Sequence, residues 1–113
     1  MKLKDKVAIV TGAGGAICGE IAVALAREGV SVAIWDISID LASKKAEEIR
    51  ASDGRAVSIE CDATDRENVT TATNVVLTEY GTIDILVNGA GGSHKESTTS
   101  PYDVKDIIMI FKI

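Results

Sequence analysis

A glycine-rich turn follows the first apolar run of the chain, and its residue types suit the binding of a phosphate group. Residues 11–19 read TGAGGAICG. Glycines allow a tight turn and a close approach of the backbone to a ligand, and the N-terminus of a following helix offers N–H groups to an anion. The G-x-x-x-x-G spacing of a P-loop is present, but Glu20 and Ile21 stand where that loop needs Lys and Ser or Thr. The G-x-G-x-x-G pattern also fails, because Ile17 replaces its third glycine. The turn therefore indicates phosphate binding by a different pattern.

Polar residues also end the next three apolar runs of the chain. Asp36 ends the second run, Asp62 follows the third, and Asn88 ends the fourth. A Mg²⁺-binding receiver domain, which has a similar alternation of elements, needs acidic residues at the end of the first run, and none is present there. The glycine turn and these three polar residues are the candidate functional residues.

The four apolar runs and the segments between them predict an alternation of strands and helices. The expected strands are residues 6–11, 30–36, 56–61 and 83–88. The expected apolar helix faces are Ile17, Ile21 and Leu25, then Leu41, Ala42, Ala46 and Ile49, then Val69, Ala72, Val76 and Tyr80. Ser38 and Thr64 are the expected N-caps of the second and third helices, the latter in a capping box with Glu67. Repeated βαβ units predict a parallel sheet between helices, with strand order 3-2-1-4 and a ligand site outside the carboxyl ends of the strands. We expect one α/β domain over residues 1–113.

The composition excludes several classes of protein. With 113 residues and 46% apolar residues, the chain can bury a core and is not disordered. Its net charge of −5 argues against nucleic acid or an anionic membrane as a partner. No apolar run approaches the roughly 20 residues of a membrane span, and the charged start MKLKDK predicts a cytoplasmic protein. Two cysteines, Cys18 and Cys61, are too few for a disulfide scaffold and are expected to be packing residues.

The motifs at the four strand ends resemble those of the short-chain dehydrogenase/reductase family. They are Thr-Gly-x-x-x-[Gly/Ala]-Ile at residues 11–17, Asp36, the Cys-Asp-Ala segment at 61–63, and the Asn-Gly-Ala-Gly segment at 88–91. The resemblance covers about residues 5–92. It implies a Rossmann-type, three-layer αβα fold that binds a dinucleotide. The implied activity is hydride transfer between nicotinamide and a carbonyl or alcohol substrate.

The resemblance also implies which residues contact the cofactor. The turn residues that should cradle the pyrophosphate are Gly12, Gly14, Gly15, Ala16 and Ile17. Asp36 should bind the adenosine ribose hydroxyls, Asp62 and Ala63 the adenine ring, and the segment Asn88, Gly89 and Ala90 should border the nicotinamide ribose. That segment is Asn-Asn-Ala-Gly in many family members. An acid at position 36 repels a 2′-phosphate, and no Arg follows it, so NAD is favoured over NADP.

Two residues of the turn depart from the family pattern. The family usually has glycine where Ala16 and Cys18 stand. A methyl group at Ala16 is a mild obstruction at the closest approach to phosphate, and Cys18 is small enough to pack against the first strand. This pair, together with the segment NGAGGSH at residues 88–94, is similar to the branch of sugar-acid and polyol oxidoreductases typified by D-mannonate oxidoreductase.

The catalytic residues of the family are not expected in this chain. Family members use a Tyr, a Lys four residues later and a Ser, which follow the fifth strand and lie beyond residue 113. Tyr102 and Lys105 are only three residues apart, and the adjacent Asp106 would raise the tyrosine pKa, so we reject this pair. His94, the single histidine, has no set of partner ligands, so no metal site is expected.

The end of the chain leads to a hypothesis about the whole protein. The apolar run 107–111 is expected to be a helix that needs partners on all sides, with Ile110 where the family commonly has an Asn. Without further strands, strand 83–88 is expected to be an unprotected sheet edge, which favours homo-oligomers. We interpret the chain as a truncated Rossmann domain, the cofactor-binding half of a longer oxidoreductase, inactive alone. The alternative is a non-catalytic dinucleotide-binding or interaction module.

Overall fold

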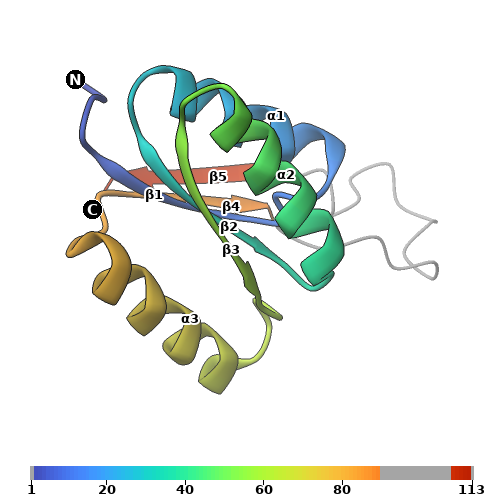
Figure 1. The fold of residues 1–113 in the computed structure, drawn as a ribbon. Helices are drawn as coiled ribbons and strands as arrows, with labels where there is room; N and C mark the ends of the chain where they lie inside the picture. The colour runs from blue at the N-terminus through green and yellow to red at the C-terminus, as the bar shows by residue number, and fades with distance from the viewer. Residues whose placement is uncertain (1, 90–107, 113) are drawn as a thin grey trace.

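The chain folds around one five-stranded sheet with helices on both faces (Figure 1). The computed structural model describes residues 2–89 and 108–112, with side chains for 2–89. The elements are β1 (Val7–Thr11), α1 (Ala16–Arg27), β2 (Ser31–Asp36), α2 (Ile39–Ala51), β3 (Arg55–Glu60), α3 (Arg66–Tyr80), β4 (Ile85–Gly89) and β5 (Ile108–Lys112). The strand order is β3-β2-β1-β4-β5, and the first four strands are parallel. The expected order 3-2-1-4 and the three-layer Rossmann-type architecture are confirmed.

The strands β1 and β2 are buried on both faces, because helices cover the sheet from both sides. All five residues of β1 are buried, and their side chains alternate between two apolar clusters. Ala8 and Val10 belong to the cluster beneath α1 and α2, whereas Val7 and Ile9 belong to the cluster beneath α3. This burial on both faces explains why the strand is a continuous apolar run rather than an alternating one.

Helices α1 and α2 pack on the sheet through small residues. The buried residues of α1 are Cys18, Gly19 and Ala22. A Cβ atom on Gly19 would lie 3.0 Å from the carbonyl oxygen of Ala13, so this face of the helix has no room for large side chains. The expectation that Ile17 and Leu41 lie on the buried faces is therefore wrong: they are 61% and 49% exposed, respectively.

The N-caps of α2 and α3 are side-chain oxygens, one of them at an unexpected residue. Ser38 caps α2, as expected, and its Oγ accepts a hydrogen bond from the Leu41 N–H at 3.3 Å. Helix α3 begins at Arg66, and its N-cap is Asp65. The Oδ1 atom of Asp65 accepts hydrogen bonds from the amides of Glu67 and Asn68. The expected cap, Thr64, lies one residue too early, and its hydroxyl instead donates to Asp62. Among the described residues, no helix is long and apolar enough to cross a membrane.

The last described segment is a strand and not the helix expected at 107–111. β5 runs antiparallel to β4, with Gly89 opposite Ile108 and Ile85 opposite Lys112. A short apolar run with β-branched residues satisfies the free edge of β4 better as a strand, because backbone groups on both strands then gain partners. The expectation that β4 is an unprotected edge is therefore also wrong.

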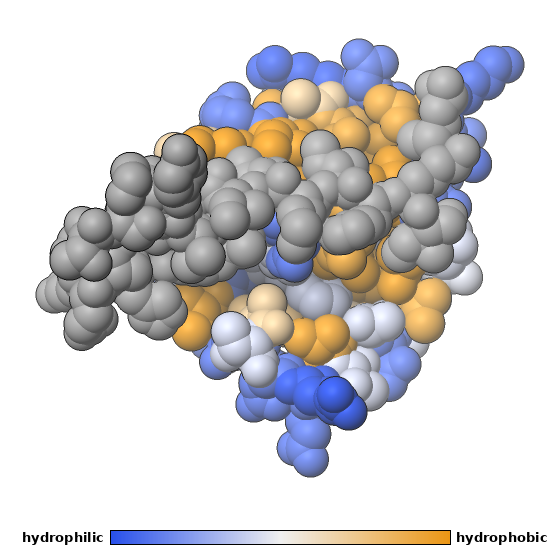
Figure 2. Space-filling view, turned by 180° about the vertical axis from the view of Figure 1, so that it is seen from behind, coloured by the Kyte–Doolittle hydropathy of each residue, from blue (hydrophilic) through white to orange (hydrophobic). Residues whose placement is uncertain are grey.

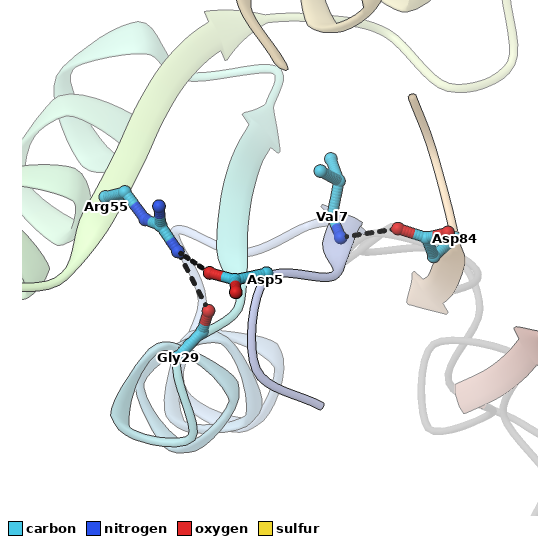
Figure 3. A network of polar contacts seen from close by, with 5 residues as sticks. All are labelled: Asp5, Val7, Gly29, Arg55 and Asp84. Carbon is cyan, nitrogen blue, oxygen red and sulfur yellow. Dashed lines mark hydrogen bonds and ion pairs between the residues drawn. The ribbon is translucent and has the colours of Figure 1, made fainter. Parts of the chain in front are cut away.

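Polar contacts join the amino ends of the strands (Figure 3). The candidate functional residues lie at the opposite, carboxyl ends of the strands. The carboxylate of Asp84 accepts from the Val7 N–H at 2.9 Å, and the Asp84 N–H donates to the Val7 carbonyl at 2.8 Å. The Arg55 guanidinium donates to Asp5 at 3.3 Å and to the carbonyl of Gly29 at 3.1 Å. These contacts hold the loops at the amino ends of the strands and leave the carboxyl ends for ligand binding.

Candidate functional site

The candidate residues gather at the carboxyl ends of the strands, because parallel strands all end on the same side of the sheet. Thr11, Asp36 and Gly89 are the last residues of β1, β2 and β4. Asp62 follows β3 by two residues, and the Cys61 N–H donates to the Asp36 carbonyl at 2.9 Å, which extends the pairing of the two strands past their ends. The glycine turn leaves β1 at the centre of this edge.

The turn leads into a helix N-terminus that has no side-chain cap. Gly12 has a φ of +66°, a conformation that glycine adopts readily. The N-cap of α1 is Gly15, which has no side chain to cap the first turn, and no acidic residue lies in that turn. Ala16 and Ile17, the first two residues of α1, are exposed. Because α2 and α3 are capped by side chains, α1 is the helix whose first amides and positive dipole end are available to an anion.

Asp36 is held by backbone amides from two segments. Its Oδ2 accepts from the Gly14 N–H and its Oδ1 from the Ser38 N–H, both at 2.9 Å. A Cβ atom on Gly14 would lie 2.8 Å from Oδ2 and 2.6 Å from the Cβ of Leu41, so glycine is required for the turn to approach this carboxylate. A carboxylate has about four lone-pair sites, and two of these remain for further donors.

Asp62 is fixed by Thr64 and Asn68. The hydroxyl and the N–H of Thr64 donate to Asp62 Oδ1 at 2.6 and 2.9 Å. The hydroxyl bond, followed by the backbone bond, lowers the pKa of Asp62 below its ordinary value. The Asp62 N–H donates to the side-chain oxygen of Asn68 at 2.6 Å. Ala63 is exposed beside them.

Thr11 joins the ends of β1 and β4 by a pair of hydrogen bonds. Its buried hydroxyl donates to Asn88 Oδ1 and accepts from the Gly89 N–H, both at 2.9 Å. Thr11 belongs to the motif at residues 11–17, but no role for it was predicted from the sequence. Its signal was a hydroxyl residue ending an otherwise apolar strand. Ala90, the remaining residue of the expected cofactor set, lies outside the described residues.

Cys18 and Cys61 are both free and buried, as expected for packing residues. Burial raises the pKa of the Cys18 thiol, and the negative charge of Asp36 raises it further. Burial likewise raises the pKa of Cys61, with Asp62 and Asp65 contributing. A raised pKa keeps each sulfur in its less reactive thiol form.

The other residues considered for chemistry lie outside the described segments. These are His94, Tyr102, Lys105 and Asp106. Among the residues whose side chains are described, no group of three or more His, Cys, Asp or Glu side chains is arranged to hold a metal ion.

Ile37 is a candidate contact that sequence analysis missed. It follows Asp36 directly, and its side chain is 70% exposed. A large exposed aliphatic side chain beside a polar ligand group offers an apolar surface to a planar ring. The signal in the sequence was an isoleucine directly after the polar end of a strand, a position at which a side chain no longer packs into the core.

Comparison with known proteins identifies the family. The chain is 39% identical over 97 residues to an uncharacterised oxidoreductase of Haemophilus influenzae, covering 86% of this chain and 34% of that protein. It is 39% identical over 92 residues to the 7α-hydroxysteroid dehydrogenase of Escherichia coli, covering 81% of this chain and 36% of the enzyme. The chain therefore spans about a third of the length of these relatives.

Solved structures agree with these sequence matches. One is a candidate D-mannonate oxidoreductase of Haemophilus influenzae with bound NAD, with a TM-score of 0.80 and 38% identity over 86% of this chain and 35% of that chain. Another is 7α-hydroxysteroid dehydrogenase with NADH and 7-oxoglycochenodeoxycholic acid, with a TM-score of 0.79 and 37% identity over 88% of this chain and 39% of that chain. The family model of the short-chain dehydrogenases matches residues 6–113. The chain belongs to the short-chain dehydrogenase family.

Proposed function

We propose that this chain binds NAD and forms the cofactor-binding part of an oxidoreductase that transfers hydride between nicotinamide and a carbonyl or alcohol. The observation that carries the proposal is the contact between the Asp36 carboxylate and the Gly14 amide at 2.9 Å. It brings an acceptor for ribose hydroxyls next to the uncapped N-terminus of α1, which suits a pyrophosphate. A Cβ atom on Gly14 would lie 2.8 Å from Asp36 Oδ2 and would force the turn away from this carboxylate.

The residues at the ends of the four parallel strands each contact a different part of the dinucleotide. The turn of Gly12, Gly14, Gly15, Ala16 and Ile17 surrounds the pyrophosphate. The first amides of α1 bind it, because the Gly14 and Gly15 amides already donate to Asp36 and to the Gly12 carbonyl. Asp36 accepts from the ribose hydroxyls. Asp62 and Ala63 contact the edge of the adenine ring, and Ile37 contacts its face. Asn88, Gly89 and Ala90 border the nicotinamide ribose, with Thr11 positioning the first two. When bound, NAD supplies the nicotinamide ring that accepts or donates the hydride.

NAD is preferred over NADP because of the charge at Asp36. Its carboxylate lies at the end of β2 with Ile37 and Ser38 following, and neither residue has a positive charge. A 2′-phosphate on the adenosine ribose would meet this carboxylate, and a like-charge contact disfavours binding. The NAD and NADH of the two structural relatives support this preference.

The substrate class is proposed from the relatives. The similarity to a candidate D-mannonate oxidoreductase favours a sugar acid or polyol, and the similarity to a hydroxysteroid dehydrogenase favours a secondary alcohol more generally. We also propose a cytoplasmic location, because Cys18 and Cys61 are free thiols, as a reducing compartment maintains them.

A second candidate function is a dinucleotide-binding module without catalysis. The pairing of β5 with β4 favours it, because the polypeptide 1–113 then has a sheet without an open β4 edge.

In either case we expect this polypeptide alone to be inactive. Hydride transfer needs an acid/base group, and Tyr102 and Lys105 lack the four-residue spacing of the family's catalytic pair. Incubation with NAD and a series of polyols and hydroxy acids should give no NADH absorbance. Turnover that Tyr102→Phe abolishes would contradict this expectation.

Calorimetric titration with NAD and NADP tests the cofactor proposal. We expect tighter binding of NAD, and Asp36→Ala should narrow the gap between the two cofactors. Asp40→Ala is the matched control, because Asp40 is an exposed acid in the first turn of α2 and should leave the gap unchanged. Binding of NADP as tightly as NAD by the unaltered chain would overturn the proposal.

A further inference from the structure

The last two residues of β4, Asn88 and Gly89, form the type of dipeptide in which asparagine deamidates most readily. In this reaction the backbone nitrogen of the next residue attacks the asparagine side chain, and glycine leaves that nitrogen open because it has no side chain. The chain has three asparagines, and the other two, Asn68 and Asn74, are each followed by a valine. The branched side chain of valine hinders the same attack. Asn88 is therefore the asparagine whose neighbour best permits deamidation.

Deamidation requires two groups of this dipeptide to meet. The Gly89 nitrogen bonds to the side-chain carbonyl carbon of Asn88, and the bond from that carbon to the side-chain nitrogen breaks. The side-chain nitrogen leaves with the Gly89 proton as ammonia. Water then opens the resulting succinimide ring at one carbonyl to give aspartate or at the other to give isoaspartate. The reaction therefore needs a Gly89 N–H that can lose its proton and an Asn88 side chain that can rotate.

One buried hydroxyl, that of Thr11, holds both of these groups. It accepts from the Gly89 N–H and donates to Asn88 Oδ1, both at 2.9 Å. The two residues lie beyond the last registered pair of β1 and β4, which is Val10 with Val87. A strand end is a place where local opening costs little free energy, so the hydroxyl lies where protection against the reaction is needed.

We propose that Asn88 is a site of spontaneous deamidation, which the Thr11 hydroxyl keeps closed in the folded chain. When the end of β4 separates from β1, both reacting groups are released together and the ring can form. The product is permanent, because it adds a carboxylate at the carboxyl end of β4. Isoaspartate also adds a methylene group to the backbone, which shifts the residues after it out of the strand pattern.

Mass spectrometry of the 113-residue chain over time tests this inference, with peptide mapping to assign the modified residue. Asn88 should deamidate at least about tenfold more slowly in the folded chain than in the chain unfolded in guanidinium chloride, because only opened molecules react. Thr11→Val removes the hydroxyl and keeps the side-chain shape. It should raise the rate in buffer about fivefold or more, since two hydrogen bonds are lost. Thr11→Ser keeps the hydroxyl and should keep the slow rate.

Thr73→Val is the matched control for the loss of a threonine hydroxyl. The Thr73 hydroxyl donates to the Val69 carbonyl at 2.7 Å within α3, far along the chain from the dipeptide. This variant should leave the rate at Asn88 unchanged. Asn68 and Asn74 are internal controls, and in the unfolded chain they should deamidate much more slowly than Asn88.

Unfolding curves in guanidinium chloride separate release at β4 from global unfolding, because they give the unfolded fraction of each variant in buffer. The inference requires Thr11→Val to deamidate faster than that fraction multiplied by the unfolded-chain rate, and a rate explained by the fraction alone would overturn it. If Thr11→Val does not fold, Thr11→Ala takes its place in the same comparison. Equal rates in the folded and unfolded forms of the unaltered chain would overturn the inference without any variant. No cofactor enters these measurements, so their outcome is independent of the proposed function.

Discussion

Gly89 and Cys18 are predicted to be a coupled pair. A Cβ atom on Gly89 would lie 2.6 Å from Cys18 Sγ and 2.8 Å from the Thr11 carbonyl oxygen, whereas ordinary contacts between such atoms are about 3.5–4.0 Å. Gly89→Ala should therefore cost about 1–3 kcal/mol of the free energy of unfolding, as overpacking of a close-packed site does. With a urea slope of about 1.5 kcal/mol per M, a loss of about 2 kcal/mol lowers the unfolding midpoint by about 1.3 M.

Cys18→Ala should recover part of that loss. It removes Sγ but keeps the Cys18 Cβ, which would lie 3.8 Å from the new Cβ, an ordinary contact. The clash with the Thr11 carbonyl remains, so we expect Gly89→Ala to cost about 1 kcal/mol less in the Cys18→Ala background, and not to become neutral. This pairing also accounts for two departures from the family pattern at once, a larger residue at position 18 and a smaller one at position 89.

A double-mutant cycle measured by urea unfolding tests this coupling. Cys61→Ala is the matched control, because Cys61 is also a buried cysteine but belongs to the cluster on the other face of the sheet. Its effect should add to that of Gly89→Ala within about 0.5 kcal/mol. If the effects of Cys18→Ala and Gly89→Ala on the free energy of unfolding also add within about 0.5 kcal/mol, the predicted coupling is refuted.

Two further predictions concern pH and the end of the sheet. Burial raises the pKa of Cys18, Cys61 and Tyr80 above their ordinary values of 9.0, 9.0 and 10.0, so the folded chain holds these protons longer than the unfolded chain. Unfolding should therefore become easier as the pH rises above about 9, which urea titrations at pH 8 and pH 10.5 will measure, and equal midpoints would contradict it. Deleting residues 104–113 removes β5 and exposes the edge of β4, so light scattering should show more association than for the full chain. If the deletion instead reduces association, β5 itself mediates the association and the prediction is wrong.

Association of the full chain stays a proposal with its own physical basis. β5 is the last strand of the described sheet, and its outer edge has no strand partner among the described elements. Figure 2 also shows apolar side chains at the surface on the face turned away from the viewer in Figure 1. Both features favour pairing with a second copy, and the test is the dependence of light scattering on chain concentration.

The sheet order and the strand ends could be predicted from the sequence because they follow from local patterns. The apolar run of β1, the glycine turn and Asp36 each have a strong local signal, and the βα alternation then restricts the topology. The burial of Ile17 was predicted wrongly, because helical periodicity does not show how closely α1 approaches the turn at Ala13 and the Lys45 side chain of α2 at Gly19. The strand at 108–112 was missed because a short apolar run fits a helix or a strand equally well until its neighbour is known.

The contacts of Thr64 and Thr11 were beyond sequence reasoning for a different reason. A threonine before a helix suits an N-cap, and only the start of α3 at Arg66 shows that Thr64 serves Asp62 instead. The bond between Thr11 and Asn88 joins residues 77 positions apart, and no local pattern reports a contact at such a separation.

That separation has a consequence for how the chain folds during its synthesis. The central strand β1 is translated before its partner β4, which follows 77 residues later. At about 5–20 residues per second, β1 waits about 4–15 s for that partner. During this interval the β1 edge that pairs with β4, Val7 to Thr11, has no partner, and an unpaired strand edge is a template for wrong strand pairing. We therefore expect wrong pairing at β1 to compete with folding until β4 has been translated.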